Sequence, residues 1–296
     1  MFSVVPIQPL SSLIAPYGEL HIDVLRMDKI HTIVSGNKWF KLSGYLTAAK
    51  QNGYTTICTF GGAFSNHIVA TAYAAKMMGF KSMGVIRGER PKEFSATLQN
   101  AAAYGMELSF VSREAYKDKS ALQNALDPDG LSYWVPEGGY GKIGAQGIKD
   151  MLRSVPYWDY THIFTAVGTG TTLAGLIEAA LPYQKIIGVS VLNNLPSILA
   201  EVKDLLSEDS ANKNFDILGD YTFGGYAKKS KELIHFMAEV YENVKLPLDF
   251  VYTAKAFYGM LQYTQKAALA KHSKLLFLHT GGLQGNQSLP QGSLPF

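Results

Sequence analysis

The feature that most constrains the fold is an alternation of short apolar or β-branched runs with longer stretches that suit helices. The strand candidates are residues 55–60, 82–87, 107–111, 131–135, 162–167, 185–191 and 274–279. The helix candidates are residues 65–78, 95–104, 145–153, 173–180, 195–206, 230–241 and 256–271. Strands separated by helices of this length form βαβ units, whose strands lie parallel in a sheet. About seven strands are more than one small sheet needs, and the glycine-rich segment 137–147 is a natural boundary. We therefore expect an α/β chain with two sheets.

Composition excludes several classes of protein. Hydrophobic residues make up 47% of the 296 residues and charged residues 17%, which is typical of a globular chain with a large core. The net charge of +3 comes without a basic stripe, so nucleic acid is not an expected partner. The single cysteine, Cys58, lies in an apolar run and is expected to be buried. The sequence contains no apolar window of about 18 residues, so no membrane helix is predicted. Residues 1–6 lack the pattern of a signal peptide, so a cytoplasmic location is expected.

Glycine-rich turns follow three of the strand candidates: Gly61–His67, Gly168–Thr172 and Thr280–Gly282. In open parallel sheets, ligands bind outside the carboxyl ends of the strands, where such turns lie. The second turn is the best candidate for a phosphate site, because glycines expose backbone N–H groups and a helix N-terminus favours an anion. It lacks the Gly-Lys-Ser/Thr ending of a P-loop and the acidic partner of a dinucleotide site. An ordinary helix cap is the alternative.

Two lysines, Lys38 and Lys41, stand three residues apart in a segment that begins Gly36-Asn37. At this spacing on a helix they share a face. A lysine amine condenses with an aldehyde once burial and a neighbouring positive charge lower its pKa. The second ammonium supplies such a charge and suits a phosphate. Taken singly, each lysine is more typical of a surface charge. The histidines show no metal-ligand spacing, and no metal is expected.

Five short motifs occur in one order along the chain: Gly36-Asn37-Lys38-x-x-Lys41-Leu42, Gly61-Gly62-x-x-Ser65-Asn66-His67, Val167-Gly168-Thr169-Gly170, Val251-Tyr252-Thr253-x-Lys255 and His279-Thr280-Gly281-Gly282. This set resembles the pyridoxal 5′-phosphate (PLP)-dependent family that contains 1-aminocyclopropane-1-carboxylate (ACC) deaminase and D-cysteine desulfhydrase, within the tryptophan-synthase-β-like fold. The resemblance extends over roughly residues 28–282. It implies two three-layer α/β domains with mostly parallel sheets and PLP in the cleft between them. The expected limits are residues 1–42 with 141–296 for the larger domain and 43–140 for the smaller.

The resemblance also implies roles for individual residues. Lys38 matches the lysine that holds PLP as a Schiff base and moves protons at the substrate, and Lys41 matches a lysine near the phosphate. Asn66 matches the residue that faces the phenolic oxygen of PLP. Ser65, Asn66 and His67 are expected to bind the substrate, and Ser65 is also expected to be catalytic. Tyr226 and Tyr252 resemble two tyrosines that line the substrate and help in catalysis. The remaining cofactor-binding positions are Gly168, Thr169, Gly170, Thr171 and Thr172 at the phosphate, Thr253 next to the pyridine nitrogen, and Thr280.

Three positions bear on the substrate. ACC deaminases in this family typically carry Glu and Leu where this chain has Thr253 and Thr280, and Gln where it has His67. D-cysteine desulfhydrases carry Ser or Thr at the first two positions. The chain departs from the family in lacking an arginine two residues after His67 and in having Ala227-Lys228-Lys229 after Tyr226. The resemblance thus favours the desulfhydrase side.

These observations predict a PLP-dependent lyase that converts D-cysteine to pyruvate, ammonia and hydrogen sulfide. ACC deamination to 2-oxobutanoate and ammonia is the first alternative, and another PLP reaction such as racemisation is the second. A binding protein without turnover would keep only the phosphate loop. The resemblance further implies a homodimer with a small amino acid as its ligand.

Overall fold

The computed structural model describes residues 5–10, 20–31, 33–34, 36–267, 269–270 and 272–296. Residues 1–4 lie outside the described residues, and they form most of the segment 1–6 used for the expectation about a signal peptide. Lys271, the expected end of the last helix, also lies outside them. The chain divides into two compact units. Unit 1 consists of residues 1–37 and 148–296, and unit 2 of residues 38–147. The domain limits expected from the sequence stay a prediction.

Unit 1 is built on a six-stranded sheet with the order β1-β2-β10-β7-β8-β9. Its strands are β1 (Ile7–Pro9), β2 (His21–Arg26), β7 (His162–Val167), β8 (Lys185–Ser190), β9 (Phe215–Leu218) and β10 (Lys274–His279). Every pair is parallel except β1 with β2, which is antiparallel. In β7 and β10 five of six residues are buried, as expected for strands covered on both faces.

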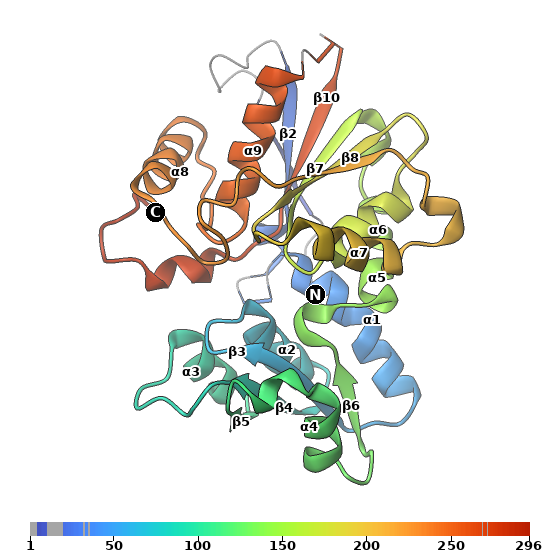
Figure 1. Cartoon of the computed structure of the whole chain (residues 1–296), viewed down its shortest axis with the longest axis vertical. Helices are drawn as coiled ribbons and strands as arrows, with labels where there is room; N and C mark the ends of the chain where they lie inside the picture. The colour runs from blue at the N-terminus through green and yellow to red at the C-terminus, as the bar shows by residue number, and fades with distance from the viewer. Residues whose placement is uncertain (1–4, 11–19, 32, 35, 268, 271) are drawn as a thin grey trace. The chain divides into compact units, whose positions relative to one another are not determined.

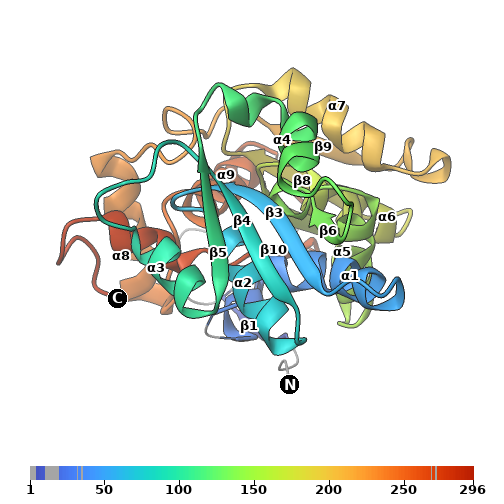
Figure 2. The same cartoon turned by 90° about the horizontal axis from the view of Figure 1, so that it is seen from below.

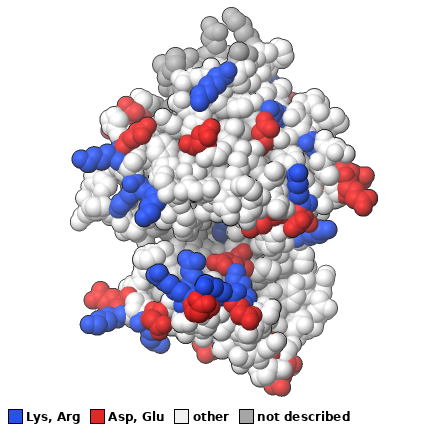
Figure 3. Space-filling model, in the orientation of Figure 1, with Lys and Arg blue, Asp and Glu red and all other residues white. Residues whose placement is uncertain are grey.

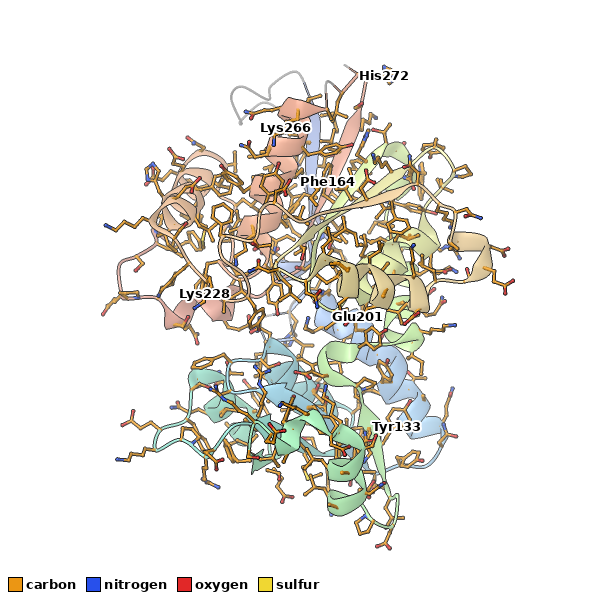
Figure 4. The ribbon with its side chains drawn as sticks, viewed as in Figure 1. Tyr133, Phe164, Glu201, Lys228, Lys266 and His272 are labelled. Atoms are coloured by element: carbon orange, nitrogen blue, oxygen red, sulfur yellow. The ribbon has the colours of Figure 1, made fainter. Side chains whose placement is uncertain are left out.

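Helices lie on both faces of this sheet. Figure 1 shows α8 (Lys231–Val244) and α9 (Thr253–Lys266) on one side and α6 (Thr171–Ala179) and α7 (Leu195–Leu205) on the other. The core contains Phe164, Phe257 and Phe277, all with essentially no exposed surface. Phe164, labelled in Figure 4, packs edge-on against Tyr263, with ring centroids 5.6 Å apart. Burial of such aromatic side chains contributes much of the stability of a core.

Unit 2 is built on a four-stranded parallel sheet with the order β5-β4-β3-β6. Its strands are β3 (Thr56–Gly62), β4 (Lys81–Arg87), β5 (Met106–Val111) and β6 (Ser132–Val135). Figure 2 shows β5, β4 and β3 side by side. The helices are α1 (Asn37–Gln51), which begins at the last residue of the first segment of unit 1, α2 (Asn66–Met77), α3 (Ala96–Ala103) and α4 (Lys119–Leu126).

The sheet of unit 2 buries two apolar clusters. Ile68 and Ala72 of α2 pack with Leu98 of α3 and with Ile86 of β4. The neighbouring residue of β4, Val85, belongs to the other cluster, with Phe60 and Tyr116. Because successive side chains of a strand point to opposite faces, the sheet is covered on both. This confirms the predicted fold class, an α/β chain with mostly parallel sheets in covered layers.

The remaining elements complete the framework. Helix α5 (Lys142–Arg153) runs across the boundary between the two units. The short 3-10 helices are η1 (Met27–Lys29), η2 (Ala115–Lys117), η3 (Glu137–Gly139), η4 (Tyr157–Asp159), η5 (Glu208–Ser210) and η6 (Leu283–Ser288). On the face that Figure 3 shows, acidic and basic side chains stand close to one another within each unit. In the part of the chain that the structure describes, we find no helix with the length and apolarity needed to span a bilayer.

Candidate functional site

The glycine-rich turn Gly168–Thr172 joins β7 to α6 and presents the N-terminus of that helix. Gly170 has φ +73°, and a Cβ there would lie 2.7 Å from a methyl group of Val202, so the turn requires glycine. Thr171 and Thr172 form the first turn of α6, and the hydroxyls of Thr169 and Thr171 lie 3.3 Å apart. The first N–H groups of a helix have no partner within it. The turn therefore has backbone donors and hydroxyls of the kind that an anion site needs, and its role as the phosphate site stays a prediction.

Asn37 ties the start of α1 to this turn. Its side-chain amide donates to the hydroxyl of Thr172 at 2.8 Å, and its backbone N–H donates to the carbonyl of Thr280 at 3.2 Å. Gly36 precedes it with φ +72°, and a Cβ there would lie 1.9 Å from the same carbonyl oxygen. No role was predicted for Asn37 from the sequence. Its position directly before Lys38 is the feature that could have indicated one.

Thr253 lies at the N-terminus of α9 and is fully buried. Its hydroxyl donates to Oδ1 of Asp249 at 2.7 Å and accepts from the Asp249 N–H at 2.8 Å. The Asp249 carboxylate also accepts the backbone N–H groups of Val251, Tyr252 and Thr253, at 2.8 to 2.9 Å. Since a hydroxyl has one proton, Thr253 has only a lone pair left for a ligand. Its predicted place at a pyridine nitrogen stays a prediction.

The structure brings the two predicted tyrosines together. The rings of Tyr226 and Tyr252 meet edge to face with centroids 5.9 Å apart, and their hydroxyl oxygens are 3.3 Å apart. A Cβ on Gly168 would lie 3.4 Å from the Tyr252 ring, so this ring lies beside the anion-binding turn. Tyr226 is about half exposed, and Lys228, labelled in Figure 4, follows it on the surface.

Lys255 is a site residue that sequence reasoning missed. Its side chain is fully buried, and its Nζ donates to the carbonyl oxygen of Gly225 at 2.7 Å, directly before Tyr226. Burial lowers its pKa to about 8, although the negative charge of Asp249 acts in the opposite direction. Lys255 thus anchors the segment that carries Tyr226. The sequence feature that could have indicated Lys255 is its place in the motif with Tyr252 and Thr253.

In unit 2, Lys38 and Lys41 lie in the first turns of α1. Lys41 is 3% exposed, and burial followed by the charge of Lys38 holds its pKa well below the usual value. The charge of Lys38 thus acts on Lys41, whereas the expected effect of Lys41 on the pKa of Lys38 stays a prediction. A lysine whose pKa is lowered carries a larger fraction of neutral, nucleophilic amine.

Ser65, Asn66 and His67 lie where β3 leads into α2. Ser65 is the N-cap residue, and the amide oxygen of Asn66 is buried without a hydrogen-bond partner among the described residues. His67 is 2% exposed, and its Nε2 lies 2.8 Å from the hydroxyl of Thr59. Burial, and then the charges of Lys38 and Lys41, lower the pKa of His67 to about 3. Thr59 is the second residue that sequence reasoning missed, because it lies inside an apolar strand.

Lys41 and His67 flank the same glycine. A Cβ on Gly139, which has φ +69°, would lie 3.1 Å from Cβ of Lys41 and 3.9 Å from Cε1 of His67. Unit 2 therefore gathers two amines and two buried polar atoms, Asn66 Oδ1 and His67 Nδ1, that have no hydrogen-bond partner within the described part of the chain. Unit 1 gathers the anion-binding turn, the tyrosine pair and Thr253.

Comparison with known proteins defines the class. Residues 6–281 match the family described as pyridoxal-phosphate-dependent enzymes, and the chain belongs to this family. It lies among homologues named for ACC deaminase and D-cysteine desulfhydrase. A Thermotoga maritima protein, whose name gives ACC deaminase as a provisional assignment, is 34% identical over 95% of this chain and 94% of its own length.

Two further relatives agree. A mitochondrial protein of Arabidopsis thaliana, named as a bifunctional D-cysteine desulfhydrase and ACC deaminase, is 28% identical over 85% of this chain and 70% of its own length. The crystal structure of an ACC deaminase homologue superposes with a TM-score of 0.80 and 28% identity, covering 96% of this chain and 91% of the other. The predictions of the family, the fold and PLP as its cofactor are confirmed.

Proposed function

We propose that this enzyme converts D-cysteine and water to pyruvate, ammonia and hydrogen sulfide, with PLP held covalently by Lys38. The carrying observation is that residues 253 and 280, where the family resemblance implies Glu and Leu in ACC deaminases, are both threonine in this chain. The proposal has two parts, the placement of the cofactor and the choice of substrate. Each part has its own support and its own test.

The placement of the cofactor rests on the two groups of residues described above. Gly168–Thr172 and the N-terminus of α6 receive the phosphate, with Lys41 as a further cation. Asn37, the residue directly before Lys38, is hydrogen-bonded to Thr172 of that turn at 2.8 Å. Asn66 contacts the phenolic oxygen, and Thr253 and Thr280 contact the ring side. When bound, PLP withdraws electrons from the α-carbon of an amino acid.

The side chains of this enzyme orient the substrate and move protons. Nζ of Lys38 carries a proton to and from the substrate, in general acid–base catalysis worth roughly 10²–10⁴-fold. The hydroxyls of Tyr226 and Tyr252, 3.3 Å apart, are close enough to pass a proton from one to the other. Ser65, Asn66 and His67 contact the amino acid. The thiol leaves from the β-carbon with a proton as hydrogen sulfide.

The choice of D-cysteine rests on Thr253. Its hydroxyl proton is donated to Asp249 at 2.7 Å, so Thr253 can offer a ring nitrogen only a lone pair. A lone pair of a neutral hydroxyl stabilises a protonated ring nitrogen less than a carboxylate does, so the ring is a weaker electron sink, which suffices for a good leaving group such as hydrosulfide. Opening the carbon ring of ACC needs a stronger one. ACC deaminase activity remains the second candidate, because a relative 34% identical to this chain carries that name.

The deciding experiment offers the PLP-loaded enzyme D-cysteine, L-cysteine and ACC, and measures sulfide, pyruvate and 2-oxobutanoate. We expect sulfide and pyruvate in equal amounts from D-cysteine. 2-Oxobutanoate from ACC without sulfide from D-cysteine would reject this substrate in favour of the second candidate. L-Cysteine appearing from D-cysteine would identify a racemase.

A further inference from the structure

The hydrogen bond between Thr59 and His67 has a direction that the structure decides. The Thr59 hydroxyl oxygen lies 2.8 Å from the backbone oxygen of Val135 and 2.8 Å from Nε2 of His67. A carbonyl oxygen can only accept, so the single hydroxyl proton of Thr59 points to Val135. The second contact is a hydrogen bond only if Nε2 of His67 carries a proton and donates it to Thr59. Both side chains are buried, with 0% and 2% exposure.

The other ring nitrogen is then a lone-pair acceptor. The pKa of His67 is lowered to about 3, so the imidazole is neutral at ordinary pH and has one proton, on Nε2. Nδ1 is buried and has no partner among the described residues. The adjacent residue, Asn66, holds a second buried acceptor without a partner, Oδ1. Buried acceptors are costly when unpaired, so a bound ligand is expected to bring N–H or O–H groups to them.

We propose that Thr59 is a positioning residue that holds His67 as the Nε2–H tautomer, so that Nδ1 accepts a hydrogen bond from the amine of the amino-acid substrate. This inference rests on the proposed function for the identity of the ligand, and on the Thr59 contacts alone for the tautomer. The substrate carboxylate is excluded from this position, because its oxygens and Nδ1 would both be acceptors. The incoming amine, before it condenses with the cofactor, carries several N–H groups and suits both His67 and Asn66.

The tautomer is tested without turnover. In protein labelled with ¹⁵N-histidine, the His67 signals, assigned by their loss in His67→Gln, are expected to show Nε2 protonated and Nδ1 bare. Thr59→Val removes the acceptor and should move the proton toward Nδ1, whereas Thr59→Ser should restore the original pattern. A His67 that keeps its Nε2 proton in Thr59→Val overturns the proposal, whatever the enzyme proves to catalyse.

The functional consequence is tested on the amino acid that the enzyme turns over. Losing one useful hydrogen bond corresponds to about a tenfold change in an equilibrium constant, so Thr59→Val should raise KM about tenfold and lower kcat less. Thr59→Ser should recover most of the affinity. In a His67→Gln background, Thr59→Val should change KM no further. Additive effects of the two substitutions would show that Thr59 acts by some other route and would reject the proposal.

A matched control lies in α2 of the same unit. Thr71 is fully buried, and its hydroxyl has no hydrogen-bond partner among the described residues. Thr71→Val therefore removes a buried hydroxyl without breaking a hydrogen bond to any of them. We expect unchanged His67 signals and unchanged KM. As a ligand control, inhibition by the substrate's analogue without the amine should be equally strong in the wild type and in Thr59→Val. A similar loss for that analogue would reject the amine as the group that meets Nδ1.

Discussion

At the scale of single residues, three lysines that sequence alone would place on the surface differ in what surrounds them. Lys255 is fully buried against the carbonyl of Gly225, Lys41 is buried beside Lys38, and Lys38 itself is partly exposed. Burial disfavours the charged form of an amine, so position decides how easily each one loses its proton. The two buried lysines therefore hold their protons less tightly than an exposed lysine does.

Lys38→Ala should abolish turnover and remove the near-visible absorbance of lysine-bound PLP, because no amine then remains at this position to hold the cofactor. Absorbance spectra after incubation with PLP test this prediction. Lys50→Ala, which changes an exposed lysine near the end of α1, serves as the control. An unchanged spectrum in Lys38→Ala would contradict the assignment of Lys38.

Lys255 should give the protein a stability that depends on pH. Burial lowers its pKa from 10.5 to about 8, so between these values the unfolded chain binds more protons than the folded one. The free energy of unfolding should therefore rise with pH across this window, by up to about 3 kcal/mol, since one pKa unit corresponds to about 1.4 kcal/mol. Urea unfolding of the wild type and of Lys255→Met at several pH values measures this.

Lys255→Met has no group to titrate at this position, so it should lack this part of the rise, whereas the exposed Lys50→Met should keep it. Lys255→Met also removes the donor to the Gly225 carbonyl, so the proposed binding of the substrate beside Tyr226 should weaken. Parallel pH profiles for the wild type and Lys255→Met would show that the buried amine does not titrate in this range.

At the scale of elements, helix starts place much of the site. The N-terminus of α6 forms part of the proposed anion-binding turn, α2 begins at Asn66, and α9 begins at Thr253, whose N–H group donates to the carboxylate of Asp249. A buried carboxylate is stable there because it accepts several N–H groups and lies at the positive end of the helix. Asp249 therefore fixes both Tyr252 and Thr253.

Asp249→Ala should lower the free energy of unfolding by about 3 kcal/mol or more, since three N–H groups and a hydroxyl lose a buried acceptor. Ser230→Ala removes the N-cap of α8, where one N–H, that of Leu233, donates to the serine at 3.1 Å, and should cost only about 1 kcal/mol. Urea unfolding of both variants makes the comparison. Equal losses would mean that the Asp249 contacts add nothing to an ordinary cap.

Several elements could be read from the sequence, and others could not. Strands β7 and β10 have the predicted bounds, because continuous apolar runs end at polar or glycine residues. Strand β2 was missed, since Asp23 and Arg26 interrupt its apolar run. Both are buried by partners distant in the chain: the hydroxyl of Tyr160 donates to Asp23 at 2.7 Å, and Arg26 contacts Gln8. Helix α4 was missed although Asp118 caps it, a signal that was present.

At the scale of the whole molecule, unit 2 is one continuous insertion, residues 38–147, in a chain whose other unit has two segments. The contacts of α1 with α5 hold the ends of the insertion together. A Cβ on Gly147 would lie 1.9 Å from the backbone oxygen of Phe40, so glycine is needed where the two helices meet. The two ends of unit 2 are therefore in contact through α1 and α5, and the unit has its own sheet and apolar clusters.

The single thiol should report the opening of unit 2. Cys58 is fully buried in β3, and burial raises its pKa to about 11. Its reaction with a thiol reagent in native buffer should be at least about 10³-fold slower than in urea-unfolded protein, because the strand must open first. A cysteine introduced as Lys50→Cys provides an exposed reference. Rapid labelling of Cys58 in the native state would contradict the covered sheet.

The sequence by itself determined the alternation of strands and helices, the turns that follow strands and the order of the motifs, because these depend on residues close together in the chain. Hence the fold class and the family could be predicted, together with the glycine turn between β7 and α6. Only the tertiary structure decided the direction of the Thr59–His67 hydrogen bond, the hydrogen bond that the Thr253 hydroxyl donates to Asp249, and the burial of Lys255. These depend on which distant groups share a water-free space, where each polar group needs a partner and each amine holds its proton less tightly.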